Sequence, residues 1–503
     1  MPVELKNKTM KAVKWNFLST ALGTVFGIVQ LWALSHILQP HEYGVISVAL
    51  MVIQFFNIFI DFGISNAIIR RQSITELELS SLYAINVCLG LLTFGVVFAL
   101  SPWMAVFFKS PELTAQVRIM SIIFLLAPFG QQQRAIMARE LRFNFIAGVA
   151  IVTLLINFVV VIGLALLYKR AWVASVAFLA STAVSVLIFF VASLRERPLS
   201  FAFSWTAARP HLRYALQLVS DSMINVISIN TYPALMARLV SLSAIGGYNI
   251  ANNISINLIE RLKPVLTQAL FPAFAKIQND QAKLATNFLL VTTYGSLVNF
   301  PLLVGMFVAS DAVVRAFFNP AWQFITPLVQ ILCLVGLFRS IDVPVISLLL
   351  VKAKMYLNVR MGMAKLLLGV ALAYWLGMAY GIIGIVCSFL IVQASNTILG
   401  YFFLVRPCVQ GLGRAYLISV LIPLLQALPI VLVGGALALT HPTAYAGVNL
   451  FLIIAGGALA YLLGLVFSPF QVVRDFLGLA SRNVSPRLER LLVRNAGAGA
   501  PHG

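Results

Sequence analysis

Charged residues are scarce throughout this 503-residue sequence: they make up 10% of it, against 61% hydrophobic residues. Acidic residues are the scarcest, with 15 Asp and Glu against 35 Lys and Arg, which gives a formal net charge of +20. No stretch has the composition of a soluble domain, so a basic domain that binds nucleic acid is excluded. A positive excess in such a chain is typical of the cytoplasmic loops between membrane spans.

Catalytic and metal-binding signatures are missing as well. The sequence has no phosphate-binding Gly-rich loop ending in Lys-Ser or Lys-Thr, no HExxH and no nucleophile elbow. Its cysteines have neither metal-ligand nor paired spacing, and we interpret them as small core residues. We therefore expect a protein that is not an enzyme and that uses no cofactor or metal. The cysteines are Cys88, Cys333, Cys387 and Cys408.

Long apolar runs fill almost the whole sequence. A helix needs about 20 mostly apolar residues to cross a hydrocarbon core of about 30 Å, and continuous apolar runs favour helices over a β-barrel. We predict an all-α integral membrane protein with about 14 transmembrane helices. The predicted spans are 15–38, 44–66, 80–101, 117–138, 144–168, 171–193, 211–239, 245–272, 285–309, 323–350, 358–379, 382–405, 415–440 and 446–468.

The charges between these spans predict the orientation of the chain. With the N-terminus inside, 28 of the 35 Lys and Arg residues fall on the cytoplasmic side, as the positive-inside rule requires. Both termini are therefore predicted to be cytoplasmic.

An internal repeat relates the two halves of the sequence at a shift of 202 residues. HILQPHEYGVISVA, residues 36–49, aligns without a gap with RLVSLSAIGGYNIA, residues 238–251, which places Gly44 over Gly246. Six helices followed by six in the same orientation predict two pseudo-symmetric lobes, which in transporters hold substrate between them and rock to alternate access. The predicted domains are a cytoplasmic basic N-terminus (1–14), an N-lobe (15–194), a cytoplasmic linker (195–210), a C-lobe (211–405), two C-terminal helices (415–468) and a partly disordered cytoplasmic tail (469–503).

Ionisable and amide side chains inside the predicted spans are the candidate site residues. Such groups are costly in hydrocarbon unless they face a cavity or a partner. Arginines would give a water-filled cationic cavity between the lobes, because guanidinium binds phosphate oxygens in pairs and suits a diphosphate. The candidates are Arg238, Arg261, Arg339, Asn249, Asn253 and Asn257 for the substrate, and Asp221, Glu260 and Asp61 for a coupling ion.

Packing explains the same residues in another way. Asn side chains commonly join helices in membranes, and Arg339 and Asp342 have the spacing of an ion pair within one helix. Asp61 would then pin a cytoplasmic loop, and Arg261 would extend to the inner surface. The sequence leaves both interpretations open.

Two regions of the sequence resemble the polysaccharide transporter family, the Wzx-type oligosaccharide flippases of the multidrug/oligosaccharidyl-lipid/polysaccharide (MOP) flippase superfamily. ILQPHEYGVISVALMVIQFFNIFIDFGISNAIIRR, residues 37–71, resembles the first helical hairpin of the family. GGYNIANN, residues 246–253, and LFPAFAKIQNDQAKL, residues 270–284, resemble its second-lobe hairpin and the loop that follows. The resemblance covers residues 5–410.

This resemblance implies a function. Such proteins move undecaprenyl-diphosphate-linked oligosaccharide units from the cytoplasmic to the periplasmic leaflet of the bacterial inner membrane, for exopolysaccharide, capsule or O-antigen assembly. It also implies alternating access coupled to H⁺ or Na⁺, and a polysaccharide polymerase and chain-length or export proteins as partners. Three alternatives stay open: a multidrug antiporter of the same fold, a peptidoglycan-precursor flippase, and a membrane glycosyltransferase or polymerase. The family has no strict site motif, so the candidate residues rest on burial and charge.

Overall fold

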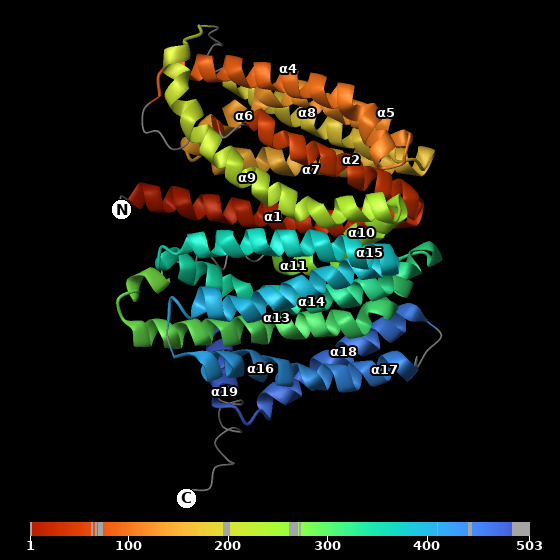
Figure 1. Ribbon diagram of the computed structural model, residues 1–503, viewed down its shortest axis with the longest axis vertical. Helices are drawn as coiled ribbons and strands as arrows, with labels where there is room; N and C mark the ends of the chain where they lie inside the picture. Colours follow the sequence, from red (N-terminus) through yellow and green to blue (C-terminus); the bar gives the residue numbers. More distant parts are fainter. Residues whose placement is uncertain are drawn as a thin grey trace, which may run out of the picture. The chain divides into compact units, whose positions relative to one another are not determined.

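The computed structural model describes residues 3–61, 64–65, 68, 74–194, 202–260, 270, 273–409, 411–440 and 445–484. Within these residues the regular elements are all helices (Figure 1). The chain divides into two compact units, residues 1–246 and 247–503. The predicted all-α membrane class is confirmed.

Unit 1 is a bundle of long helices. α7 packs against α1 and α8, α6 packs against α4 and α8, and α9 returns across α2 and α4. The start of α4 is a capping box, in which the Thr75 hydroxyl accepts from the backbone N–H of Glu78 and the Glu78 carboxylate accepts from the backbone N–H of Thr75. Unit 1 comprises α1 (Val3–Ile37), α2 (Pro40–Asp61), α4 (Glu76–Phe107), α5 (Glu112–Ser121), α6 (Ile123–Arg139), α7 (Phe143–Tyr168), α8 (Trp172–Leu194) and α9 (Trp205–Leu239).

Unit 2 is built around α13. This helix packs against α14, α16 and α18, and its Phe288 ring stacks on Tyr416 at 5.9 Å between centroids. The helices are α10 (Leu242–Ile254, which begins in unit 1), α11 (Ile256–Glu260), α13 (Gln281–Phe317), α14 (Thr326–Val351), α15 (Met355–Gly400), α16 (Gly413–Pro429), α17 (Gly435–Thr440), α18 (Ala446–Val466) and α19 (Gln471–Val484). A 3₁₀ segment, η1 (Pro320–Ile325), precedes α14, and π-helical segments η2 (Tyr401–Val405) and η3 (Ile430–Gly434) follow α15 and α16.

α15 is a hairpin of two helical arms. Gly381 has a positive φ of 61°, a backbone conformation that favours glycine. A Cβ on Gly384 would overlap the carbonyl oxygen of Leu376, so the arms approach closely beside the turn. The arms correspond to the predicted spans 358–379 and 382–405.

The number of membrane crossings stays a prediction. Within the described residues each predicted span coincides with one to three helical segments, and eleven helices there are long and apolar enough to cross a membrane. One of the eleven, Met355–Val405, holds both arms of the α15 hairpin. The predicted span 211–239 lies in α9, and the described part of 245–272 holds α10 and α11, but none of these three helices is among the eleven.

Two glycines that the repeat aligns lie against each other where α2 and α10 begin. A Cβ on Gly44 would overlap the carbonyl oxygen of Leu242, and a Cβ on Gly246 would lie 2.6 Å from the carbonyl oxygen of Pro40 and 3.0 Å from the backbone nitrogen of Gly44. The 202-residue shift relates Pro40 to Leu242 as it relates Gly44 to Gly246. The contact is therefore reciprocal, as between elements related by a local two-fold axis.

The predicted domain limits are not tested by the division into units. α9 lies in unit 1 because it packs on α2 and α4, whereas the predicted C-lobe begins at residue 211. Packing does not report which helices move together during transport, so the lobes stay a prediction. The predicted tail begins with a helix, α19, whose Phe476 ring lies 5.3 Å from that of Tyr294, and residues 485–503 lie outside the described residues.

Candidate functional site

The structure does not describe the side chains of three of the predicted site residues. Arg261 falls in a stretch without a described backbone, and for Asp61 in α2 and Asp221 in α9 only the backbone is described. The other six candidates have described side chains. They fall at three places, one in unit 1 and two in unit 2.

Arg238 lies at the end of α9, beside the end of α4. Its guanidinium carbon is 5.4 Å from the ring centroid of Phe107, a distance at which a cation is attracted to an aromatic face. The two residues line an apolar hollow of about 750 Å³, to which Trp103 also contributes. Arg238 therefore adds a positive charge to an otherwise apolar site in unit 1.

The three predicted asparagines lie together at the junction of α10 and α11. Asn253 donates through Nδ2 to the carbonyl oxygen of Asn249 at 2.8 Å, and Asn257 donates to Oδ1 of Asn253 at 3.0 Å. Asn252 adds a bond from its Nδ2 to Oδ1 of Asn257 at 3.1 Å. These amides bridge the break between the two helices, which agrees with the packing interpretation and leaves the residues half-buried.

Arg339 and Glu260 form an ion pair between α14 and α11. Nη1 of Arg339 lies 3.3 Å from Oε1 of Glu260, and the two side chains are 30% and 31% exposed. The Arg339 guanidinium also lies 5.1 Å from the ring centroid of Phe389 in α15. Arg339 is midway along α14, so this pair belongs to the middle of a predicted span.

Asp342 belongs to a second polar group one turn further along α14. Its Oδ2 accepts from Nε2 of Gln393 at 2.9 Å and from Nδ2 of Asn396 at 3.4 Å. Nζ of Lys365, on the other arm of the α15 hairpin, donates to Oε1 of Gln393 at 2.6 Å. The fully buried Gln393 amide thus links a cation to an anion inside unit 2.

From the sequence, Lys365 is predicted to be one of the cytoplasmic charges, and Gln393 and Asn396 are not among the predicted site residues. One signal was available: Lys365 lies inside the predicted span 358–379, where an ammonium group needs a partner. Gln393 and Asn396 are spaced one turn apart in an apolar run. The α15 hairpin brings the partner of Lys365 from its other arm. A local sequence pattern cannot show which helix supplies it.

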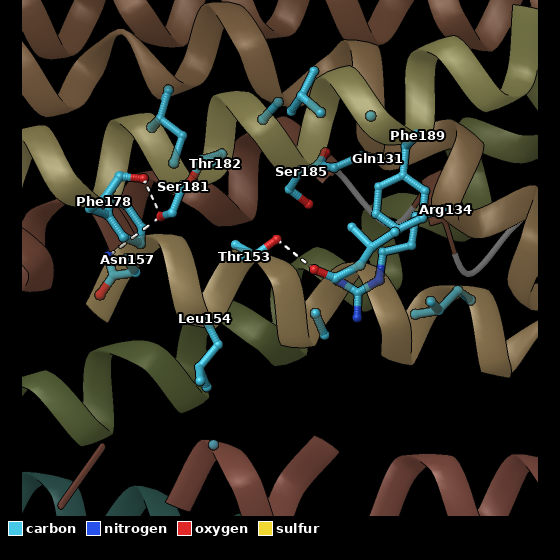
Figure 2. A pocket seen from close by; sticks show the side chains of 18 of the residues that line it. Gln131, Arg134, Thr153, Leu154, Asn157, Phe178, Ser181, Thr182, Ser185 and Phe189 are labelled. Atoms are coloured by element: carbon cyan, nitrogen blue, oxygen red, sulfur yellow. Dashed lines mark hydrogen bonds between the residues drawn. The ribbon is translucent and has the colours of Figure 1, made fainter. Parts of the chain in front are cut away.

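A pocket of about 570 Å³ with both polar and apolar lining lies within unit 1, among α1, α2, α6, α7 and α8 (Figure 2). Nδ2 of Asn157 donates to Oγ of Ser181 at 3.4 Å at one end of it. Arg134 is the one ionisable residue among the described residues that line it. From the sequence, Arg134 is predicted to be one of the cytoplasmic charges, and no pocket is predicted here. Its polar lining includes Gln30, Asn57, Gln131, Arg134, Asn157 and Ser185.

No described part of the chain gathers three His, Cys, Asp or Glu side chains in a way that would hold a metal ion. The polar groups instead offer guanidinium, ammonium, amide and hydroxyl donors. Such donors suit oxygen-rich, anionic or polyhydroxylated ligands.

A family profile and individual protein sequences both match this chain. A profile of the family described as "Polysaccharide biosynthesis protein" matches residues 33–327. The lipopolysaccharide biosynthesis protein WzxC of Escherichia coli K12 is 35% identical over 437 residues, which cover 87% of this chain and 89% of that protein. An uncharacterized membrane protein in the cps region of Klebsiella pneumoniae is 32% identical over 478 residues, which cover 95% of this chain and 98% of that protein.

Among solved structures, the lipid II flippase MurJ in an inward closed conformation resembles this chain. It matches with a TM-score of 0.71 at 14% identity, over 94% of this chain and 99% of that one. At this identity the likeness concerns the fold alone.

Proposed function

Because the chain belongs to the polysaccharide biosynthesis protein family, among the Wzx-type flippases of the MOP superfamily, we propose that it moves undecaprenyl-diphosphate-linked oligosaccharide units across the bacterial inner membrane. The units would pass from the cytoplasmic to the periplasmic leaflet by alternating access and feed exopolysaccharide, capsule or O-antigen assembly. The chain itself is a multi-pass membrane protein. Its proposed partners are a polysaccharide polymerase and chain-length or export proteins.

The single observation that carries the substrate assignment is the partly exposed Arg339–Glu260 pair in the middle of a predicted span. An intramembrane arginine is retained where it meets a partner or a substrate, and this one keeps 30% of its side chain accessible. A guanidinium can bind two phosphate oxygens at once. We infer that the diphosphate of the lipid carrier replaces Glu260 as the partner of Arg339 during transport.

The other predicted residues extend this proposal. Arg238 and Arg261 would add positive charge for the diphosphate, and the amides at the α10–α11 junction would bind it or the first sugar when their mutual bonds open. Those amides belong to Asn249, Asn253 and Asn257. Coupling to H⁺ or Na⁺ would use the carboxylates of Asp61, Asp221 and Glu260.

A multidrug antiporter of the same fold is the alternative that the charges disfavour. A cationic drug needs carboxylates in its path, whereas the lining of the unit 1 pocket carries Arg134 and, among the described residues, no Asp or Glu. A peptidoglycan-precursor flippase would share the diphosphate lipid and differ in the glycan. A membrane glycosyltransferase or polymerase would need a catalytic domain, for which the short links between the predicted spans offer no room.

The proposal is tested in a strain that lacks the gene, by measuring the amount and the leaflet of lipid-linked oligosaccharide. Wild-type protein should clear units that accumulate on the cytoplasmic face. Arg339→Ala, at normal expression, should slow clearance by about tenfold or more, because a charged hydrogen bond contributes about 1.5–3 kcal/mol and 1.4 kcal/mol is about tenfold in affinity.

The matched control is Arg315→Ala. Arg315 is also an arginine of unit 2, but its Nε bonds Oδ2 of Asp311 at 2.7 Å on an exposed face of α13, so its loss should leave clearance unchanged. If lipid-linked units never accumulate in the deletion strain and drug tolerance falls instead, the multidrug alternative replaces this proposal.

A further inference from the structure

The unit 1 pocket is formed by packed helices rather than by loops. α6 and α8 meet closely at its wall, since a Cβ on Gly130 would lie 3.1 Å from Cα of Val186. Phe26 and Phe189 line the pocket, and their rings are held by edge contacts with Phe158 at 5.2 Å and Phe145 at 6.0 Å. The pocket therefore has fixed aromatic walls. Its volume of about 570 Å³ lies within the range of about 300–1,000 Å³ that small-molecule sites occupy.

Hydrogen-bonding capacity in this pocket is left unused. Oε1 of Gln131 is buried and has no hydrogen-bond partner within the described structure, a situation that is destabilising unless a ligand or water donates to it. Arg134 forms no ion pair with any described residue. By contrast Thr153 donates to the carbonyl oxygen of Val149 at 2.8 Å, so part of the polar lining is already satisfied.

The unsatisfied groups gather at one end. Figure 2 shows Gln131, Arg134 and Phe189 together at one end of the pocket, with Asn157 and Ser181 at the other. One end therefore offers a guanidinium and a free amide acceptor, and the other offers neutral amide and hydroxyl groups. Nothing acidic in the described lining neutralises Arg134.

These groups match one class of ligand. Amides and hydroxyls bind the hydroxyl groups of a sugar, an aromatic face covers its C–H side, and a guanidinium pairs with a carboxylate through two parallel bonds. A cationic drug would be repelled by Arg134, and an inorganic anion would leave the neutral end and the aromatic walls unused. We propose that the unit 1 pocket binds an acidic sugar residue of the transported glycan, with Arg134 on its carboxylate and Gln131 accepting from a ring hydroxyl. This inference rests on the proposed function and adds the class of sugar to it.

The test is direct binding to the purified full-length protein in lipid nanodiscs, by titration calorimetry. The probes are a trimer of galacturonic acid and, as its neutral counterpart, maltotriose. Wild-type protein should bind the acidic trimer about tenfold more tightly than the neutral one. Arg134→Gln should reduce the affinity for the acidic trimer to that for maltotriose, and Arg134→Lys should restore part of the difference.

Arg142→Gln is the matched control, because it removes the same charge nearby. Nε of Arg142 lies 3.1 Å from Oε2 of Glu140 outside the pocket, so this variant should bind as wild type does. Equal thermal unfolding temperatures of the variants without ligand show that each one folds. The proposal is overturned if wild type binds neither trimer or binds both equally, or if Arg134→Gln keeps the wild-type preference.

The leaflet measurement separates this inference from the proposed function. If wild-type protein clears lipid-linked units but shows no preference for the acidic trimer, the flippase function stands and the acidic-sugar site is wrong. If wild type clears nothing, the flippase function itself fails. The calorimetric titration would then report only whether the unit 1 pocket binds an acidic sugar.

Discussion

At the scale of single residues, the Gln393 side chain links two charged groups in unit 2. Its amide accepts from the Lys365 ammonium at 2.6 Å and donates to the Asp342 carboxylate at 2.9 Å. A buried amide that is satisfied at both ends stabilises the packing of the helices that it joins, whereas a half-satisfied one destabilises it. The two charges are therefore held apart by one neutral group that each of them orients.

This arrangement predicts the effect of Lys365→Met. The substitution keeps the length and apolar stem of the side chain but leaves Oε1 of the buried Gln393 without its donor. We expect a loss of about 1–3 kcal/mol in the free energy of unfolding, measured by denaturant titration of the purified protein. In Lys352→Met, which removes an exposed bond of 2.8 Å to the carbonyl oxygen of Gln278, the change should stay within about 0.5 kcal/mol. Equal losses in both variants would contradict the linking role of Gln393.

The same residue scale shows why site residues are only partly predictable. The sequence offers Asp342 as a partner for Arg339 because spacing along one helix is all that a sequence reports. In the structure Arg339 pairs with Glu260 from α11, and Asp342 accepts from the second arm of α15. Polar residues inside a span are readily selected by their cost in hydrocarbon, but their partners belong to other helices.

At the scale of elements, backbone contact replaces side-chain packing where α2 and α10 begin. A methyl group on Gly44 would overlap the carbonyl oxygen of Leu242, and one on Gly246 would overlap that of Pro40. Neither helix therefore has room for a side chain at this contact. Backbone atoms cannot rotate away as side chains can. A larger residue at either position must therefore separate the two helices.

Gly44→Ala and Gly246→Ala should each lower the free energy of unfolding by about 1–3 kcal/mol, the range for overpacking. The double variant should lose less than the sum, because the two positions share one contact. Gly148→Ala is the control, since a Cβ there meets nothing within 4 Å and alanine favours a helix over glycine by about 1 kcal/mol. Unfolding curves of the purified variants measure all four. If Gly44→Ala behaves as Gly148→Ala does, α2 and α10 are not in backbone contact.

At the scale of the whole molecule, the distribution of Lys and Arg predicts the orientation. Fourteen crossings and a cytoplasmic N-terminus would place Thr440, at the end of α17, outside and Gln278, before α13, inside. In a cysteine-free background, Thr440→Cys should react with a membrane-impermeant maleimide in intact cells. Gln278→Cys should react only after permeabilisation, which makes it the control for membrane integrity. Reaction of Gln278→Cys in intact cells would mean that a span before α13 has been assigned wrongly.

The sequence by itself determined the class of the protein, its helices and its family. Hydrophobic length is a local property, so each predicted span coincides with a helical segment within the described residues, and the quoted hairpin motifs led to the family that the comparisons confirm. α19 is not predicted because the segment is too polar to resemble a membrane span. Only a few of its residues, such as Val473 and Phe476, pack against the core.

Only the tertiary structure decided which helices meet. The pocket with the free Gln131 oxygen needs five helices to close around it, and the link from Lys365 through Gln393 to Asp342 needs the turn at Gly381. The repeat aligned Gly44 with Gly246, but their contact requires the two helices to lie side by side. Residue composition and hydrophobic periodicity report on one helix at a time. These contacts form between helices, and tertiary packing decides which helices become neighbours.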